Sequence, residues 1–176
     1  MTMRIWRALP LALALAACGG GEETSADPAA LELTPGSWAA NEGQASFADV
    51  EGNLLATFRC DAATTELILE TPGDFADGAR PAMLLRAGDF MHGIDPVEVR
   101  GDASGPMKVA RLPSGGPISR ILMTTNASMT IETEGAPALM LENGEALQGF
   151  LERCASETGQ ETSAIAQAGA SSEAGE

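Results

Sequence analysis

The stretch LLATFRC, from Leu54 to Cys60, decides the fold because apolar residues recur at every second position. Successive side chains of an extended strand point to opposite faces, so alternate positions share a face. One face of this segment is wholly apolar and carries Leu54, Ala56, Phe58 and Cys60. The other face carries Leu55, Thr57 and Arg59. The pattern predicts a half-buried β-strand that ends on an inward-facing cysteine.

Short segments of this kind follow along the chain, separated by turn-forming residues such as Pro72-Gly73-Asp74 and Gly101-Asp102. The predicted strands are Leu54–Cys60, Glu66–Glu70, Ala82–Arg86, Val97–Arg100, Met107–Leu112, Ile118–Thr124, Ser128–Glu132 and Ala138–Leu141. Many short strands with turns between them are typical of antiparallel sandwiches and barrels. The predicted fold class is therefore mainly β, an antiparallel sandwich or barrel-like domain.

The last apolar segment, Ala146–Arg153, has the spacing of a helix. The apolar residues there lie three, one and three positions apart, at Leu147, Phe150, Leu151 and Cys154. This spacing places them on one helical face. Asn143 is the expected N-cap. The sequence thus predicts one C-terminal helix, with Cys154 on the side that meets the sheet.

These elements occupy residues 37–154, a length typical of a single domain. Residues 18–36 are rich in Gly, Glu, Ala, Pro and Thr, which predicts a flexible spacer. Residues 155–176 contain one large aliphatic residue, Ile165. That segment cannot bury enough apolar surface to offset its ordering entropy, so we expect a disordered acidic tail.

Residues 1–17 have the pattern of an export signal. Arg4 and Arg7 give the start a positive charge, and the apolar run Leu9–Ala17 follows. This run is shorter than the roughly 20 residues of a transmembrane helix, but it suits the apolar core of a signal peptide. The run ends in Leu15-Ala16-Ala17-Cys18. The alternative to a specific lipidation signal is an ordinary secretory signal that ends in cysteine by chance.

Leu15–Cys18 resembles the lipobox of bacterial lipoproteins. The resemblance implies that the Cys18 thiol takes a diacylglyceryl group, that the signal is removed, and that the lipid attaches the protein to a membrane. Gly19 follows the cysteine, where an aspartate would retain a lipoprotein at the inner membrane of enteric-type bacteria. The expected location is therefore the cell envelope, on the outer membrane and facing the periplasm.

The chain is strongly acidic, with 25 Asp and Glu against 10 Lys and Arg and a net charge of −15. Without Arg4 and Arg7 of the signal, the formal charge is −17. Nucleic-acid binding needs basic patches that neutralise phosphate, so this class of function is excluded. The charge either keeps the protein soluble or steers a cationic protein toward it.

With Cys18 lipidated, Cys60 and Cys154 remain, both on predicted inward faces. Exported proteins fold under oxidising conditions, and two cysteines allow one pairing, so the sequence predicts a Cys60–Cys154 disulfide. The alternative is a redox or metal-binding pair, but the chain has no CxxC motif and no nearby histidine.

His92 is the only histidine, which argues against a zinc site with several His and Cys ligands. The chain contains the residue types of a catalytic triad, namely His92, Asp95 and either Ser104 or Ser114. However, neither serine lies in the G-x-S-x-G elbow of serine hydrolases. We also find no phosphate-binding glycine loop, nucleotide motif or haem motif. The sequence predicts no catalytic residues, no metal and no cofactor.

Two resemblances cover the domain itself. From Trp38 through Phe58-x-Cys60 to Gly149–Cys154 (GFLERC), it resembles small uncharacterised exported proteins of alphaproteobacteria, which also pair an early strand cysteine with one in a terminal segment. It is similar to the membrane-bound inhibitors of c-type lysozyme in its lipobox, size, Phe58-x-Cys60 strand and acidity. The aromatic and glycine pattern of their central strands is absent.

The functional prediction is a lipid-anchored periplasmic protein with a non-enzymatic binding or structural role. Its partners would be the membrane, through the lipid, and a cationic protein. The alternative is an inhibitor of a cationic envelope-attacking enzyme such as lysozyme. A hydrolase would require His92 to meet a serine within a cleft.

Overall fold

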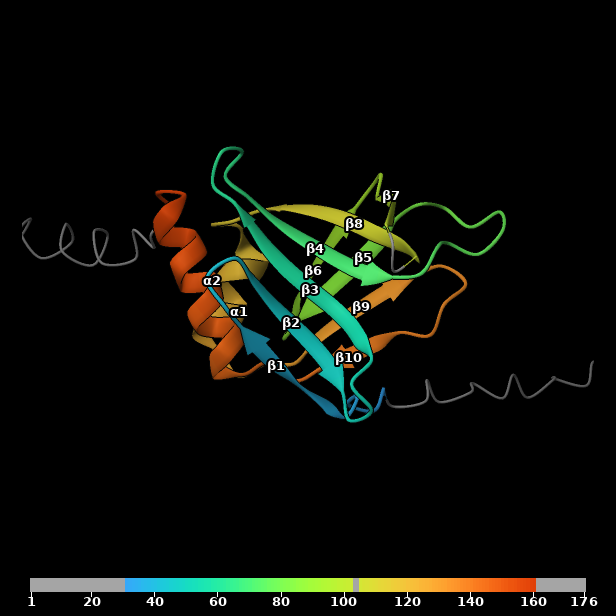
Figure 1. Ribbon diagram of the computed structural model, residues 1–176, viewed down its shortest axis with the longest axis horizontal. Coiled ribbons are helices and arrows are strands. Elements are labelled where there is room, and N and C mark those ends of the chain that lie inside the picture. Colours follow the sequence, from blue (N-terminus) through green and yellow to red (C-terminus); the bar gives the residue numbers. More distant parts are fainter. Residues whose placement is uncertain (1–30, 103–104, 161–176) are drawn as a thin grey trace, which may run out of the picture. The chain divides into compact units, whose positions relative to one another are not determined.

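The computed structural model describes residues 31–102 and 105–160, which form two antiparallel β-sheets and two helices (Figure 1). The six-stranded sheet has the order β1-β2-β3-β4-β8-β7, and the four-stranded sheet has the order β10-β9-β5-β6. The sheets pack as a sandwich and do not close into a barrel. The prediction of a mainly β, antiparallel domain with a C-terminal helix is confirmed. Of the two predicted architectures, sandwich and barrel, the structure shows the sandwich.

The strands of the larger sheet are β1 (Gly36–Ala40), β2 (Gln44–Asp49), β3 (Leu54–Asp61), β4 (Glu66–Pro72), β7 (Glu98–Asp102) and β8 (Gly105–Pro113). Those of the smaller sheet are β5 (Met83–Ala87), β6 (Phe90–Ile94), β9 (Met129–Thr133) and β10 (Leu139–Leu141). The helices are α1 (Pro117–Thr124) and α2 (Glu145–Glu157).

From Ala56 to Cys60 the alternation along β3 places the side chains as the sequence predicts. A bulge opposite Phe47 and Ala48 interrupts it at the start of the strand, and Leu55, predicted on the other face, packs against the core. Ala56 and Phe58 are buried on the inner face, where Phe58 lies opposite Leu69 of β4. Leu54, at the start of the strand, is 41% exposed and lies at the end of the sandwich. The inner faces of both sheets contribute to one hydrophobic core, which includes Leu85 of β5. Burial of these alternate positions fixes the register of the central strands.

Trp38 closes the core where β1 meets the helical end of the sandwich. Its ring lies edge-on to Phe47, with 5.3 Å between centroids, and stacks on Phe58 at 5.8 Å. Its indole Nε1–H donates to the carbonyl oxygen of Glu142 at 2.7 Å. The apolar body of the ring is thus packed while its polar atom has an acceptor.

The segment Ile118–Thr124 was predicted as a strand, but it forms helix α1. Its β-branched residues favour a strand, yet Pro117 stands at the first helical turn, where proline is well tolerated. Ile118 and Leu122 are four residues apart and both buried, so helix formation places both in the core. Helix α1 contacts β5 and β6, helix α2 contacts β1 and β2, and the two helices contact each other (Figure 1).

Asn143 does not cap helix α2 as predicted, because Gly144 is the N-cap residue. The amide nitrogen of Asn143 instead donates to the carbonyl oxygens of Leu122 and Thr125, each at 2.7 Å. Both carbonyls lie at the C-terminal end of α1, where the last helical carbonyls lack partners within the helix. The asparagine therefore joins the end of one helix to the start of the next.

The structure bonds Cys60 to Cys154, as the sequence predicts, with 5.5 Å between their Cα atoms. Cys60 lies at the inner face of β3, and Cys154 is buried on α2. The bond spans a sequence separation of 94 residues, from the third strand to the last helix. It therefore links the larger sheet to the C-terminal helix across most of the domain.

Residues beyond both predicted domain boundaries take part in the fold. Leu33, expected in the spacer, forms a bridge with Met140, and the backbone N–H of Thr34 donates to the Met140 carbonyl at 2.7 Å. Helix α2 continues to Glu157, because Ala155 packs on its buried face, one turn after Leu151. Neither helix of the described part has the length and hydrophobicity needed to cross a bilayer. The expected signal, Cys18, Gly19 and the tail from residue 161 lie outside the described residues.

Removing the disulfide by the double substitution Cys60→Ala/Cys154→Ala is expected to lower the free energy of unfolding by about 4–5 kcal/mol. A chain-entropy argument for a closed loop of this length gives that magnitude. The measurement is urea unfolding with and without reductant. Reductant should destabilise the wild type by a similar amount and leave the double variant unchanged. A wild-type midpoint that does not move with reductant would contradict the prediction.

Candidate functional site

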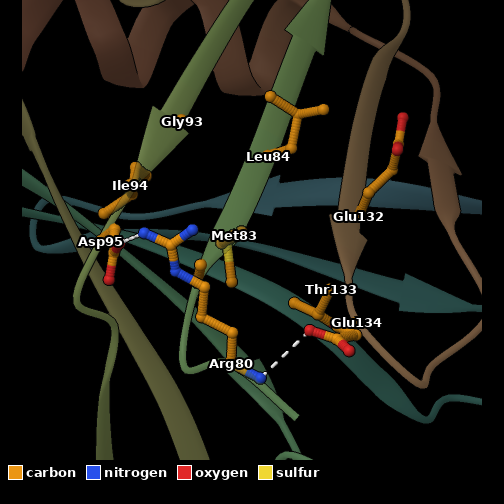
Figure 2. Close-up of a pocket in the computed structure, with 10 residues that line it drawn as sticks. Arg80, Met83, Leu84, Gly93, Ile94, Asp95, Glu132, Thr133 and Glu134 are labelled. Atoms are coloured by element: carbon orange, nitrogen blue, oxygen red, sulfur yellow. Dashed lines mark hydrogen bonds and ion pairs between the residues drawn. The ribbon is translucent and has the colours of Figure 1, made fainter.

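A hollow lies on the face of the four-stranded sheet that points away from the core (Figure 2). Its volume is about 550 Å³. Strands β5, β6 and β9 supply most of its walls, and residues at their ends form its rim. Its lining includes Arg80, Leu84, Gly93, Asp95, Glu132 and Glu134. We call this the outer hollow.

Gly93, which lacks a side chain, leaves part of the outer hollow open. The register places Leu84 of β5 directly opposite Gly93 of β6 on one side and Glu132 of β9 on the other. All three positions point away from the core. A Cβ atom added at Gly93 would meet no atom within 4 Å, so the space over this glycine is open. Leu84, half-buried, forms an apolar floor between the glycine and the carboxylate.

Charged groups surround this floor. The guanidinium of Arg80 pairs with Asp95, and the backbone N–H of Arg80 donates to Glu134 Oε2 at 3.1 Å. Arg80 thus crosses one end of the hollow between the strands β6 and β9 (Figure 2). Glu132 accepts from Nε of the neighbouring Arg86 at 2.6 Å. The three carboxylates of Asp95, Glu132 and Glu134 and the two guanidinium groups of Arg80 and Arg86 together carry one net negative charge.

This arrangement suits a group that is apolar along its length and cationic at its end. Such a group can cover Leu84 and present its charge to Glu132 and Glu134, whose oxygens are only partly used. The titratable groups that line the hollow are carboxylates and one guanidinium. Their chemistry favours hydrogen bonding and ion pairing with a bound molecule.

A second, smaller pocket of about 250 Å³ lies between the two sheets. Apolar side chains line most of it, and its polar members are Thr71, Lys108 and Thr133. The walls come from β3, β4 and β8 of the larger sheet and from β9 and β10 of the smaller one. We call this the inter-sheet pocket.

Lys108, the only lysine of the chain, points into the inter-sheet pocket and is 7% exposed. Its ammonium donates to the carbonyl oxygen of Pro72 at 3.3 Å and lies 5.8 Å from the centroid of the Phe75 ring. Burial lowers the pKa of Lys108, and the more distant charge of Asp74 raises it by a smaller amount. An ammonium in these surroundings is less favourable than one in water.

Of the alternative catalytic triad, the described residues His92, Asp95 and Ser114 are not hydrogen-bonded to one another. His92 lies on the inner face of β6, opposite Leu85, and lines a small cavity with Leu112 and Ile118. The Ser114 hydroxyl is hydrogen-bonded to the Thr158 hydroxyl at 2.8 Å, and Asp95 pairs with Arg80. Ser104 lies outside the described residues. Where the chain is described, no three or more His, Cys, Asp or Glu side chains are grouped so as to hold a metal ion.

Neither pocket is predicted from the sequence, although the sequence carries one signal for the inter-sheet pocket. Met107–Leu112 was predicted as a strand, and its alternation places Lys108 on the same face as Ala110 and Leu112. A lone lysine on an apolar face is a signal for a buried cation. No comparable signal marks the outer hollow, because it depends on which residue stands opposite Gly93.

The buried ammonium makes the stability depend on pH. Because the pKa of Lys108 is lowered on folding, the unfolded chain binds more protons between that lowered value and about 10.4. The free energy of unfolding should therefore rise with pH across this window. The chain has no tyrosine, so no other side chain has an ordinary pKa between about 9 and 12. Urea unfolding midpoints at pH 7.5 to 10.5 measure the effect.

The substitution Lys108→Met is expected to abolish this rise and to increase stability near pH 7. Arg111→Gln removes a cation from the outer face of the same strand and should preserve the rise. A wild-type stability that falls over this range would show that burial does not disfavour the ammonium.

No protein-family model, curated protein or solved structure matches this chain.

Proposed function

We propose that this chain is a lipoprotein of the bacterial cell envelope, anchored through Cys18 to the outer membrane, whose periplasmic domain acts by binding another protein. The observation that carries the proposal is the use of the three cysteines. Cys60 and Cys154 are bonded to each other, and Cys18 stands at the end of the leader, where the lipobox cysteine stands.

The disulfide supports export because thiols are kept reduced in the cytoplasm, whereas disulfides persist in the oxidising compartments outside it. The first strand begins at Gly36, so a segment rich in Gly, Glu and Ala separates Cys18 from the sandwich. Such a segment serves as a spacer between a lipid and a folded domain. Two or more acyl chains, as bacterial lipoproteins carry, hold a protein durably on a membrane, whereas one chain binds only marginally.

The outer hollow supports a binding role with a cationic partner. Its floor is apolar at Leu84, and its rim has one more carboxylate than guanidinium groups. The net charge of −15 adds a long-range attraction for a positively charged protein, which salt weakens. A lysine or arginine side chain of that partner fits the hollow in shape and charge.

An inhibitor of a cationic envelope-attacking enzyme such as lysozyme is the second candidate. The specific observation in its favour is that Glu132 and Glu134 present carboxylate oxygens to solvent beside an apolar floor. An arginine of the enzyme can occupy that position. This candidate differs from the first in requiring that binding blocks the activity of the enzyme.

Lipidation is tested by producing the full chain in a Gram-negative bacterium and measuring the intact mass of the purified protein. We expect a polypeptide that begins at Cys18 and carries the added mass of the acyl chains. Cys18→Ala should appear in the soluble fraction. The double variant Cys60→Ala/Cys154→Ala is the control and should remain with the membrane. A mature chain that begins elsewhere, without acyl mass, would refute the anchor.

Binding is tested with lysozyme as the cationic probe at low salt. We expect Glu132→Gln/Glu134→Gln to weaken binding about threefold to tenfold, since each exposed ion pair contributes modestly. The control Glu152→Gln/Glu157→Gln makes the same charge change at exposed positions of α2 and should have a smaller effect. Loss of cell lysis on binding supports the inhibitor, and binding without loss of lysis supports the general binding role. Equal weakening by both double variants would show that the outer hollow is not the site.

A further inference from the structure

We propose that the inter-sheet pocket binds a small amphiphilic carboxylate, with Lys108 and Thr71 holding the carboxylate group and the apolar walls holding the tail. This site is distinct from the outer hollow, and the proposal does not depend on the anchor or on a cationic partner. It rests on the position, the unused donors and the shape of the pocket.

The first observation is the position of Thr71 and Lys108. They are directly opposite each other on β4 and β8. The preceding pairs on the same inner face are apolar, namely Leu67 with Leu112 and Leu69 with Ala110. The polar pair thus interrupts an apolar surface at the end of the sandwich, where both side chains point between the sheets. A core position of this kind is normally filled by an aliphatic residue.

The second observation is that both groups have unused hydrogen-bonding capacity. Thr71 is 3% exposed, and its hydroxyl has no hydrogen-bond partner. The ammonium of Lys108 has three N–H donors, and the contact with the Pro72 carbonyl uses one of them. No carboxylate of the described residues lies within 4.0 Å of this ammonium. Buried polar groups normally have partners, so these donors indicate a missing acceptor.

The missing acceptor is best supplied by an anion, because the group to be matched is a buried cation. The charge of Asp74 acts on it, but no carboxylate of the described residues lies within 4.0 Å of it. A carboxylate offers several acceptor sites and can accept from the ammonium and the hydroxyl together. A neutral ligand would leave the charge uncompensated. The charge and the two donors therefore select a carboxylate over an alcohol or an amine.

The third observation is the nature of the walls. Apart from Thr133, the rest of the lining is apolar, with Leu54, Leu55, Ile131, Pro137 and Leu139 as its larger members. At about 30 Å³ for each water-sized group, 250 Å³ accommodates roughly eight such groups. This size matches a carboxylate with a tail of about six carbons. The partly exposed side chain of Leu54 continues the apolar surface out of the pocket, so a slightly longer tail is accommodated.

Octanoate is the probe for this site. The chain from Gly19 to Glu176, made without acyl chains, retains every described residue and contains one lysine. Labelling with ¹³Cε-lysine therefore gives a single side-chain resonance, which reports on Lys108 alone. We expect octanoate to shift this resonance in a saturable manner. Octan-1-ol, with the same tail, and acetate, without one, should each bind at least tenfold more weakly.

Calorimetric titration of octanoate into two variants tests the roles of the polar pair. Lys108→Met and Thr71→Val should each weaken binding about tenfold or more, as expected for the loss of a charge-assisted hydrogen bond. Thr71→Val should at the same time fold as stably as the wild type or more so, because it removes an unpaired hydroxyl. Arg111→Gln, on the outer face of β8, is the control and should bind octanoate like the wild type.

Three outcomes would overturn the proposal. They are a lysine resonance that octanoate does not shift, equal binding of octan-1-ol and octanoate, and unchanged affinity in Thr71→Val. Because Thr71→Val is expected to fold, its affinity for octanoate tests the proposal even if Lys108→Met fails to fold. None of these outcomes bears on lipidation or on the outer hollow, so failure here leaves the proposed function intact.

Discussion

Burial of the alternate side chains of β3 between the two sheets is the constraint on which the rest of the structure depends. This strand pairs with β2 on one side and β4 on the other, so its register is transmitted to both neighbours. A slip by one residue would turn Phe58 outward and Arg59 inward. The same register brings Cys60 to the helical end of the sandwich, where it bonds to Cys154 of α2. The disulfide thus stabilises, at the helical end of the sandwich, an arrangement that is determined by hydrophobic burial.

The apolar period made the central strands and the helix α2 predictable from the sequence, because apolar residues recur at every second position in the strands and at helical spacing in α2. It failed where local signals were weak or misleading. Strands β1 and β2 each contain one large apolar residue, Trp38 and Phe47, among small or polar residues, so they lack an apolar run. Strand β6 contains Gly93 and follows a turn. In α1 the isoleucines indicated a strand, but Pro117 and packing of Ile118 and Leu122 decided for a helix.

The sites were less predictable than the fold because they depend on pairs of residues brought together by sheet register. The pairing of Cys60 with Cys154 could be predicted, since the third cysteine, Cys18, is expected to carry the lipid. The outer hollow needs Gly93 opposite Leu84, and the inter-sheet pocket needs Thr71 opposite Lys108. Neither pairing can be read from one strand alone. The loop after β9 adjoins both sites, since Glu134 lies on the rim of one and Pro137 on the wall of the other.

The contrast between arginine and lysine in this chain supports the separate role of the inter-sheet pocket. Several arginines lie on outer faces beside carboxylates, such as Arg59 with Glu70 at 2.5 Å and Arg111 with Glu66 at 2.9 Å. A guanidinium suits such pairs because its planar set of donors matches a carboxylate. The ammonium of Lys108 is a compact charge, placed where the protein offers it one carbonyl and no carboxylate. The chain is acidic, and the two arginines just named each have a carboxylate partner. The ammonium of Lys108 is buried and has no carboxylate partner among the described residues, which is best explained by an anion from outside the chain.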